Sequence, residues 1–194
     1  MNTEYFTLLS DRLRKHLAFS NDEIQLIFEK GKLKKFKRGQ FIINEGSVIR
    51  KTNFILEGSL IAYFIDADAQ EHMIQFGIEG WWISDIHSYT FGGPSKYNVQ
   101  ALESGSLLEI SFEDMQWLYK NIPALEKYFL IITQRAFAGF QERIVNNLCL
   151  SAEERYEAFK IKYPKIELRF PQKWIASYLG MSAEFLSKIK NKRI

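Results

Sequence analysis

The sequence has a single cysteine, Cys149, among 194 residues. One cysteine excludes an internal disulfide, and it excludes a zinc site or an iron–sulfur cluster whose cysteine ligands all come from this chain. The simplest interpretation of Cys149 is a small, buried apolar residue. Histidine is also scarce, and His16, His72 and His87 form no closely spaced pair, so we expect no metal site.

Long apolar runs are missing as well. No stretch approaches the roughly 18 residues that a membrane-spanning helix needs. Residues 1–17 mix charged and apolar side chains and contain neither the apolar core nor the small-residue cleavage site of a signal peptide. We therefore expect a cytoplasmic protein with no membrane partner. Because hydrophobic residues make up 46% of the chain and charged residues 25%, we expect a packed core rather than disorder.

The sequence also lacks a catalytic constellation. Serine, histidine and aspartate are present, but no nucleophile motif surrounds any of them, so we predict no catalytic residues and no enzyme activity. A metal enzyme of the cupin type would need a histidine cluster, which the chain does not have.

The net charge of +3 is small, but its distribution is uneven. Residues 160–194 contain nine basic and two acidic side chains, a net charge of +7, whereas the remaining residues contain 17 basic and 21 acidic side chains, a net charge of −4. This uneven charge indicates two parts with different roles, and the basic C-terminal part is the one expected to lie near phosphates. A solvated lysine-rich tail would give the same charge distribution.

Glycine is concentrated in the middle of the chain, where eight of the eleven glycines lie between Gly39 and Gly105. Short apolar or alternating stretches broken by turn residues are typical of an antiparallel sandwich or barrel. A capping box, Ser20 to Glu23, with a hydrophobic staple of Phe19 and Ile24 predicts a preceding helix over 21–30. The expected strands are 32–37, 48–56, 59–65, 72–76, 97–102 and 107–110.

Residues 124–150 contain no proline and only one glycine, Gly139, and they predict a long helix. Apolar residues cover so much of its circumference that more than one side must be buried. The simplest way to bury the second side is to pack it against the same helix of another subunit. The alternative is that the helix is buried entirely within one chain. The stripe that we assign to the dimer helix consists of Leu125, Phe129, Ile132, Ala136, Phe140 and Ile144.

A second capping box, Ser151 to Glu154, predicts a helix that ends at Pro164, and residues 166–170 are expected to form a short strand. The next segments, 172–179 and 183–190, have the spacing of a helix-turn-helix. In this motif a small residue, Ala176, lies where the helices cross. Gly180 can adopt the positive φ that the turn requires, and the Ser182 side chain can cap the second helix. An ordinary helical hairpin is the alternative, but the local positive charge favours DNA.

In a helix-turn-helix the second helix enters the major groove. Glu184 can accept a hydrogen bond from cytosine, and Lys188 can reach guanine. Gln172 and Lys173 lie at a helix start, where phosphates bind. Lys190, Lys192 and Arg193 are expected to add non-specific affinity. The predicted DNA-binding residues are Gln172, Lys173, Ser182, Ala183, Glu184, Ser187 and Lys188.

The whole chain resembles the Crp/Fnr transcriptional regulators. The residues that carry the resemblance are Phe36–Gly46, Phe54–Leu60, and Pro171 to Ser182 followed by Glu184, Ser187 and Lys188. The resemblance implies an α+β fold with a cyclic-nucleotide-binding-like, antiparallel β-roll (jelly-roll-like) domain, a long dimerisation helix and a C-terminal helix-turn-helix domain. The corresponding domains are residues 1–122, 123–150 and 151–194.

At the expected effector site, this sequence differs from the family members that bind cyclic nucleotides. Their Gly-Glu and Arg-Ser pairs correspond here to Ser84-Asp85 and Ser95-Lys96, so the arginine that would hold the cyclic phosphate is missing. A different small-molecule effector and no effector at all are the open alternatives. The effector-pocket candidates are Trp82, Ser84, Asp85, Ser95, Lys96 and Tyr97, of which the aromatic residues could equally pack in the core.

We therefore predict a homodimeric, sequence-specific regulator that binds double-stranded DNA at a near-palindromic operator. RNA polymerase would be a further partner if the protein activates transcription. No cofactor is assigned beyond a possible unidentified small-molecule effector. The competing hypothesis is a ligand-sensing module whose basic C-terminus contacts protein or RNA. A steep salt dependence of duplex binding distinguishes the two.

Overall fold

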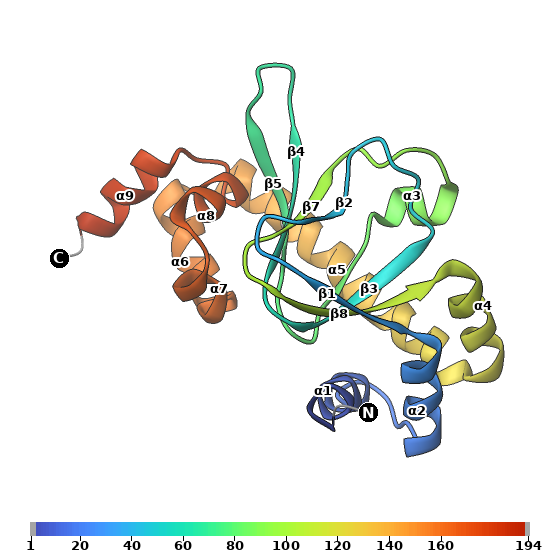
Figure 1. Ribbon diagram of the computed structural model, residues 1–194. Helices are drawn as coiled ribbons and strands as arrows, with labels where there is room; N and C mark the ends of the chain where they lie inside the picture. The colour runs from blue at the N-terminus through green and yellow to red at the C-terminus, as the bar shows by residue number, and fades with distance from the viewer. Residues whose placement is uncertain (1–2, 193–194) are drawn as a thin grey trace. The chain divides into compact units, whose positions relative to one another are not determined.

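The computed structural model describes residues 3–192, and Arg193 lies outside them. The strands are β1 (Lys32–Phe36), β2 (Phe41–Ile43), β3 (Lys51–Glu57), β4 (Leu60–Ile65), β5 (Glu71–Gly77), β6 (Trp82–Ile83), β7 (Asn98–Ala101) and β8 (Gly105–Ser111). The helices are α1 (Thr3–Arg14), α2 (Asn21–Lys30), α3 (Ile86–Phe91), α4 (Phe112–Asn121), α5 (Pro123–Cys149), α6 (Ala152–Lys162), α7 (Pro164–Arg169), α8 (Gln172–Tyr178) and α9 (Ala183–Asn191). Figure 1 shows their arrangement.

The strands form two four-stranded sheets with the orders β1-β8-β3-β6 and β2-β7-β4-β5. Strand β8 pairs antiparallel with β1 and β3, β3 with β6, and β2 with β7. Phe54 lies opposite Leu108, and both side chains are fully buried. Two antiparallel sheets packed around an apolar core, a long helix and short C-terminal helices confirm the predicted fold class.

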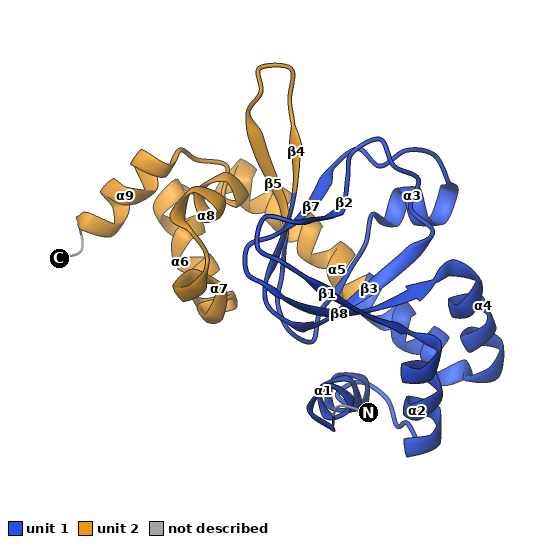
Figure 2. Ribbon diagram, in the orientation of Figure 1, with its two compact units in different colours: residues 1–62, 76–133 blue, residues 63–75, 134–194 orange. Residues whose placement is uncertain are grey.

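The chain divides into two compact units (Figure 2). Unit 1 contains residues 1–62 and 76–133, and unit 2 contains residues 63–75 and 134–194. The predicted domains change at residues 122 and 150, whereas the division between the units falls inside α5 and assigns the outer part of the β4–β5 hairpin to unit 2.

The apolar core of unit 1 joins the N-terminal helices to one sheet and to the start of α5. The capping box at Ser20 and Glu23 is present, and the staple residues Phe19 and Ile24 are buried as predicted. The fully buried members of this core include Leu9, Leu13, Ile24, Ile27, Phe54, Leu108, Ile110, Met115, Leu118, Leu125 and Tyr128. The first part of α5 is therefore anchored in unit 1.

The strand predicted at 166–170 and the predicted burial of Cys149 are both wrong in this structure. Residues 166–170 do not form a strand, because α7 covers most of them and the Phe170 amide donates to the Ile166 carbonyl at 2.9 Å. Ile166 and Phe170 are buried four residues apart, whereas Leu168 is 85% exposed, so the burial has a helical period. Cys149 is exposed rather than buried, because it ends α5 next to Leu148, which is also exposed.

Some elements give no clear signal in the sequence and were not predicted. They are α1, α3, β2 and β6. α3 and β6 are short, six and two residues, so no periodic pattern can develop over them. Among the described residues, no helix is both long and apolar enough to cross a membrane.

Candidate nucleic-acid interface

The turn between α8 and α9 has the geometry of a helix-turn-helix corner. Gly180 has a positive φ of 67°, and the Met181 amide donates to the Ala176 carbonyl at 3.0 Å. The Ser182 hydroxyl caps α9 by accepting from the Phe185 amide at 3.1 Å. These features fix the angle between the two helices, and the apolar residues that close the corner are all buried: Ile175, Ala176, Leu179, Leu186 and Ile189.

The outer face of α9 carries the predicted base-reading residues. Glu184 and Lys188 are exposed, and Ala183 and Ser187 are half-buried. The pKa of Glu184 lies below its ordinary value, because a backbone amide and then the Ser182 side chain stabilise the carboxylate, with a smaller contribution from Lys188. Glu184 is therefore ionised at neutral pH and can act only as a hydrogen-bond acceptor.

The two residues predicted to hold phosphates already have partners within the chain. The Gln172 side-chain amide donates to the Ala183 carbonyl at 3.3 Å, which joins the starts of the two helices. The Lys173 ammonium lies 2.8 Å from the Glu71 carboxylate of β5. Lys173 must exchange this ion pair for a phosphate in order to act as predicted.

The contact between β5 and α8 was not predicted from the sequence. The Met73 amide donates to the Ser177 hydroxyl at 2.8 Å, and that hydroxyl donates to the Glu71 carbonyl at 3.2 Å. The rings of Tyr63 and Trp174 lie 5.1 Å apart. All of these residues belong to unit 2. Contacts between segments about one hundred residues apart leave no periodic signal in a sequence.

Two of the lysines predicted to add non-specific affinity are also paired. Lys190 donates to Glu167 at 2.9 Å, and the Tyr156 hydroxyl donates to the same carboxylate at 2.8 Å. The hydrogen bond from Lys190, followed by that from Tyr156, lowers the pKa of Glu167. Lys192 lies 3.5 Å from Glu153. These pairs neutralise part of the basic C-terminal segment.

The effector-pocket candidates in unit 1 are joined mainly by hydrogen bonds to one another and to the backbone. The Asp85 carboxylate is buried, caps α3 by accepting from the Ser88 amide at 3.1 Å, and accepts from the Ser95 hydroxyl at 2.7 Å. The Ser84 hydroxyl donates to the Lys51 carbonyl. The Tyr97 hydroxyl donates to the Ser84 carbonyl, and burial raises the pKa of that phenol, with Asp85 adding to the rise.

The two remaining candidates lie apart from this network. Lys96 is exposed. The indole of Trp82 donates to the Tyr128 hydroxyl at 3.2 Å and packs against Phe54 and Phe129, with ring centroids 5.0 and 4.8 Å away. Trp82 therefore packs in the core, which is the alternative that its sequence left open.

The stripe assigned to the dimer helix does not remain on one free surface. Leu125 is fully buried, and Phe129 and Ile132 pack against the core of the same unit, so Leu125 cannot contact a second subunit and its assignment is wrong. Phe140 and Ile144 are exposed, as is Ala136. The exposed apolar side chains of α5 include three that the predicted stripe omitted, Leu130, Phe137 and Leu148.

The chain is similar to known proteins over most of its length. A family model described as "Cyclic nucleotide-binding domain" matches residues 33–121. The fumarate and nitrate reduction regulatory protein of Vibrio cholerae is 25% identical over 182 residues, which cover 87% of this chain and 70% of that protein. The transcriptional activator protein anr of Pseudomonas aeruginosa is 22% identical over 181 residues, covering 87% and 72% respectively.

Solved structures share the fold. The c-di-GMP responsive global regulator CLP of Xanthomonas campestris has a TM-score of 0.71 at 12% identity, covering 89% of this chain and 91% of that one. FixK2 from Bradyrhizobium japonicum also has a TM-score of 0.71, at 15% identity, covering 84% of this chain and 83% of that one.

Proposed function

Because these comparisons confirm the resemblance of the chain to the Crp/Fnr family, we propose that it is a sequence-specific DNA-binding transcription regulator. The single observation that carries the proposal is the helix-turn-helix corner at Gly180, which presents Glu184 and Lys188 on the exposed face of α9. The related proteins are named as regulators rather than as enzymes.

In this proposal α9 enters the major groove and α8 lies across the phosphate backbone. Lys188 donates to a guanine edge, and the ionised Glu184 accepts from a cytosine amino group. Gln172 fixes the angle between the helices through the Ala183 carbonyl, and Lys173 binds phosphate once it leaves Glu71. Base contacts then supply the specificity, and the phosphate contact supplies position.

We also propose that the regulator is a homodimer joined along the exposed apolar face of α5. Leu130, Phe137 and Ile144 follow one another at intervals of seven residues, and Leu148 follows four residues later, which is the repeat of a two-helix interface. All four side chains are exposed in the single chain, Phe137 by 63% and Leu148 by 80%. A symmetric dimer would place two copies of α9 about 34 Å apart, one turn of duplex DNA.

The β-roll is proposed not to bind cyclic AMP. A bound cyclic phosphate needs free donors, whereas the Ser95 hydroxyl is directed to Asp85, and the adjacent Lys96 is exposed and lacks the fork of an arginine. Calorimetric titration with cyclic AMP should therefore give no saturable heat, and micromolar binding would contradict this part of the proposal.

The salt dependence of duplex binding tests the proposed function. We expect the affinity for duplexes selected from a random pool to fall steeply as salt rises, because phosphate contacts release counterions. Lys188→Ala should reduce the preference for the selected sequence over random duplex by about 1–3 kcal/mol. Lys35→Ala, which removes an exposed lysine from β1, is the control of equal charge and should leave the preference unchanged. A flat salt response, or tighter binding to single-stranded RNA, would favour the competing hypothesis.

A further inference from the structure

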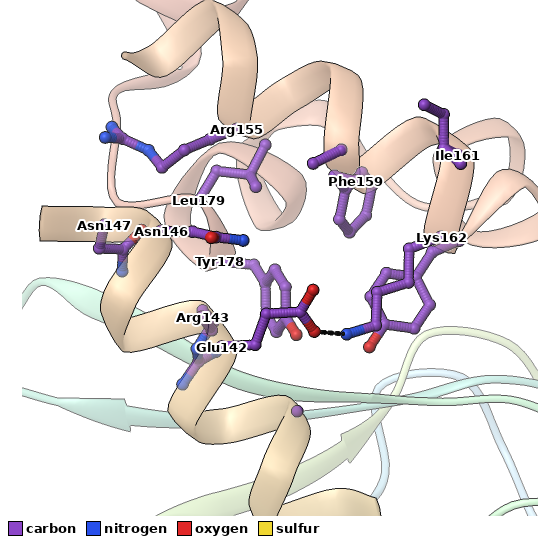
Figure 3. A pocket seen from close by; sticks show the side chains of 13 residues that line it. Glu142, Arg143, Asn146, Asn147, Arg155, Phe159, Ile161, Lys162, Tyr178 and Leu179 are labelled. Carbon is purple, nitrogen blue, oxygen red and sulfur yellow. Dashed lines mark hydrogen bonds and ion pairs between the residues drawn. The ribbon is translucent and has the colours of Figure 1, made fainter. Parts of the chain in front are cut away.

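A cavity of about 340 Å³ lies between the second part of α5, α6 and α8, entirely within unit 2 (Figure 3). This volume is at the lower end of the range for small-molecule sites. One face of α5 contributes Gly139, Glu142, Arg143, Asn146 and Asn147. The facing surface comes from Arg155, Ala158, Phe159, Ile161, Lys162 and Tyr163, together with Tyr178 at the end of α8 and Leu179 directly after it.

The lining is positively charged. Arg143, Arg155 and Lys162 line the cavity together with a single acid, Glu142, and Lys162 forms an ion pair with Glu142 (Figure 3). The guanidinium of Arg155 donates through one terminal nitrogen to the Leu150 carbonyl at 2.8 Å, while its Nε is buried without an acceptor. Arg155 therefore contributes positive charge to the lining rather than a donor that a guest could reach.

Aromatic rings form the other wall of the cavity. The ring centroid of Phe159 lies 5.5 Å from that of Tyr163 and 5.8 Å from that of Tyr178. The guanidinium of Arg143 lies 4.5 Å from the centre of the Tyr178 ring. Burial raises the pKa of Tyr178 to about 12, so this phenol stays neutral and adds no negative charge to the site. Flat apolar rings beside cations favour a flat anionic guest.

Gly139 provides an independent observation. It lies inside a helix of 27 residues, where glycine is less stable than alanine. A Cβ built on Gly139 would meet only the end of the flexible Lys162 side chain, at 4.0 Å, so no packing within the chain requires a glycine there. The missing side chain leaves space over this point of the cavity.

We propose that this cavity binds a small planar organic anion, such as an aromatic carboxylate. The ring would stack against Tyr178 and Phe159 above Gly139, and the acid group would pair with the Lys162 ammonium, which lies 4.0 Å from the Cβ position of Gly139. Gly139 lies two residues after Phe137 and hence about 200° away around the helix axis, so pairing of α5 along Phe137 leaves the cavity open. The proposal does not depend on DNA binding, because it is tested on the protein alone.

Calorimetric titration with 2-naphthoate, and with its neutral analogue 2-naphthamide, tests the proposal. We expect one saturable site per chain that prefers the carboxylate at least tenfold. Gly139→Leu, which fills the cavity, should weaken 2-naphthoate binding at least tenfold. Gly139→Ala should weaken it less while raising the thermal midpoint, a combination that misfolding does not produce. Lys96→Ala, on the exposed residue of the β-roll, should bind as the unaltered chain does.

Three results would overturn the proposal. The first is no saturable binding of 2-naphthoate. The second is equal affinity for the carboxylate and the amide, since the cations would then contribute nothing. The third is loss of binding in Lys96→Ala together with full binding in Gly139→Leu, because the site would then lie in the β-roll.

Discussion

The Lys173 ammonium on α8 lies 2.8 Å from the Glu71 carboxylate at the start of β5. The ion pair occupies a lysine that the proposed function assigns to phosphate. Both side chains are substantially exposed, so solvent screens the pair and its contribution is small. DNA can therefore compete with Glu71 for Lys173.

Glu71→Gln should strengthen duplex binding by about two- to fivefold, because Lys173 no longer has to leave a carboxylate before it binds phosphate. Fluorescence anisotropy with a labelled duplex measures the change. Glu113→Gln removes the carboxylate that pairs with Arg50 in unit 1 and changes the net charge equally, so it is the matched control. In a Lys173→Ala background Glu71→Gln should have no effect, and an unchanged gain there would mean that Glu71 acts only through long-range repulsion.

Phe137→Glu should convert the dimer into a monomer, because it places a charge in the centre of the exposed apolar face of α5. Sedimentation velocity should give twice the chain mass of 22.8 kDa for the unaltered protein and the single mass for the variant. Gln116→Glu, on an exposed position of α4, should remain dimeric. A monomeric unaltered protein at micromolar concentration would rule out the proposed pairing.

The same substitution should have opposite effects at two glycines. Gly180→Ala should destabilise the protein by about 1–2 kcal/mol, because its φ of 67° disfavours any side chain although no atom lies closer than 3.8 Å to the new Cβ. Gly139→Ala should stabilise it by about 0.5–1 kcal/mol, because alanine favours the interior of α5. Urea denaturation measures both, and a stabilising Gly180→Ala would contradict the turn geometry.

Acid should weaken the packing of α7 against α9. The pKa of Glu167 is lower in the folded protein than its ordinary value, mainly because Lys190 and Tyr156 donate to the carboxylate. A lowered folded pKa contributes stability above the unfolded pKa, and that stability is lost as the pH falls through the folded pKa. Glu167→Gln should therefore lower stability at pH 7 and flatten its decline in acid, whereas an unchanged pH dependence of unfolding would contradict the role of this carboxylate.

Local patterns predicted the parts of the fold that depend on neighbours in sequence. The capping boxes at Ser20 and Ser151 start helices where they were expected, and the positive φ of Gly180 matches its place in the turn. The side of α5 that is buried within its own chain was harder to predict, because apolar residues surround much of the helix. Only the structure distinguishes Leu125, which is buried in its own chain, from Phe137, which is exposed.

Contacts between distant segments could not be read from the sequence. The ion pair of Glu71 with Lys173 joins residues 102 positions apart, and neither residue has a neighbour that marks the contact. The same holds for the cavity at Gly139. The glycine could be noted in the sequence, but the position of Phe159 on the opposite wall could not be predicted. In the β-roll the resemblance identified Asp85 and Ser95, but the hydrogen bond between them appears only in the structure.

Selection of bound duplexes from a random-sequence DNA pool shows whether α9 reads a DNA sequence. We expect the unaltered protein to enrich a near-palindromic sequence with half-site centres about 10 base pairs apart, and Lys188→Ala to lose this enrichment while still binding DNA weakly. A pool that remains random after repeated rounds with the unaltered protein, or an enriched motif that Lys188→Ala retains in full, would contradict this expectation.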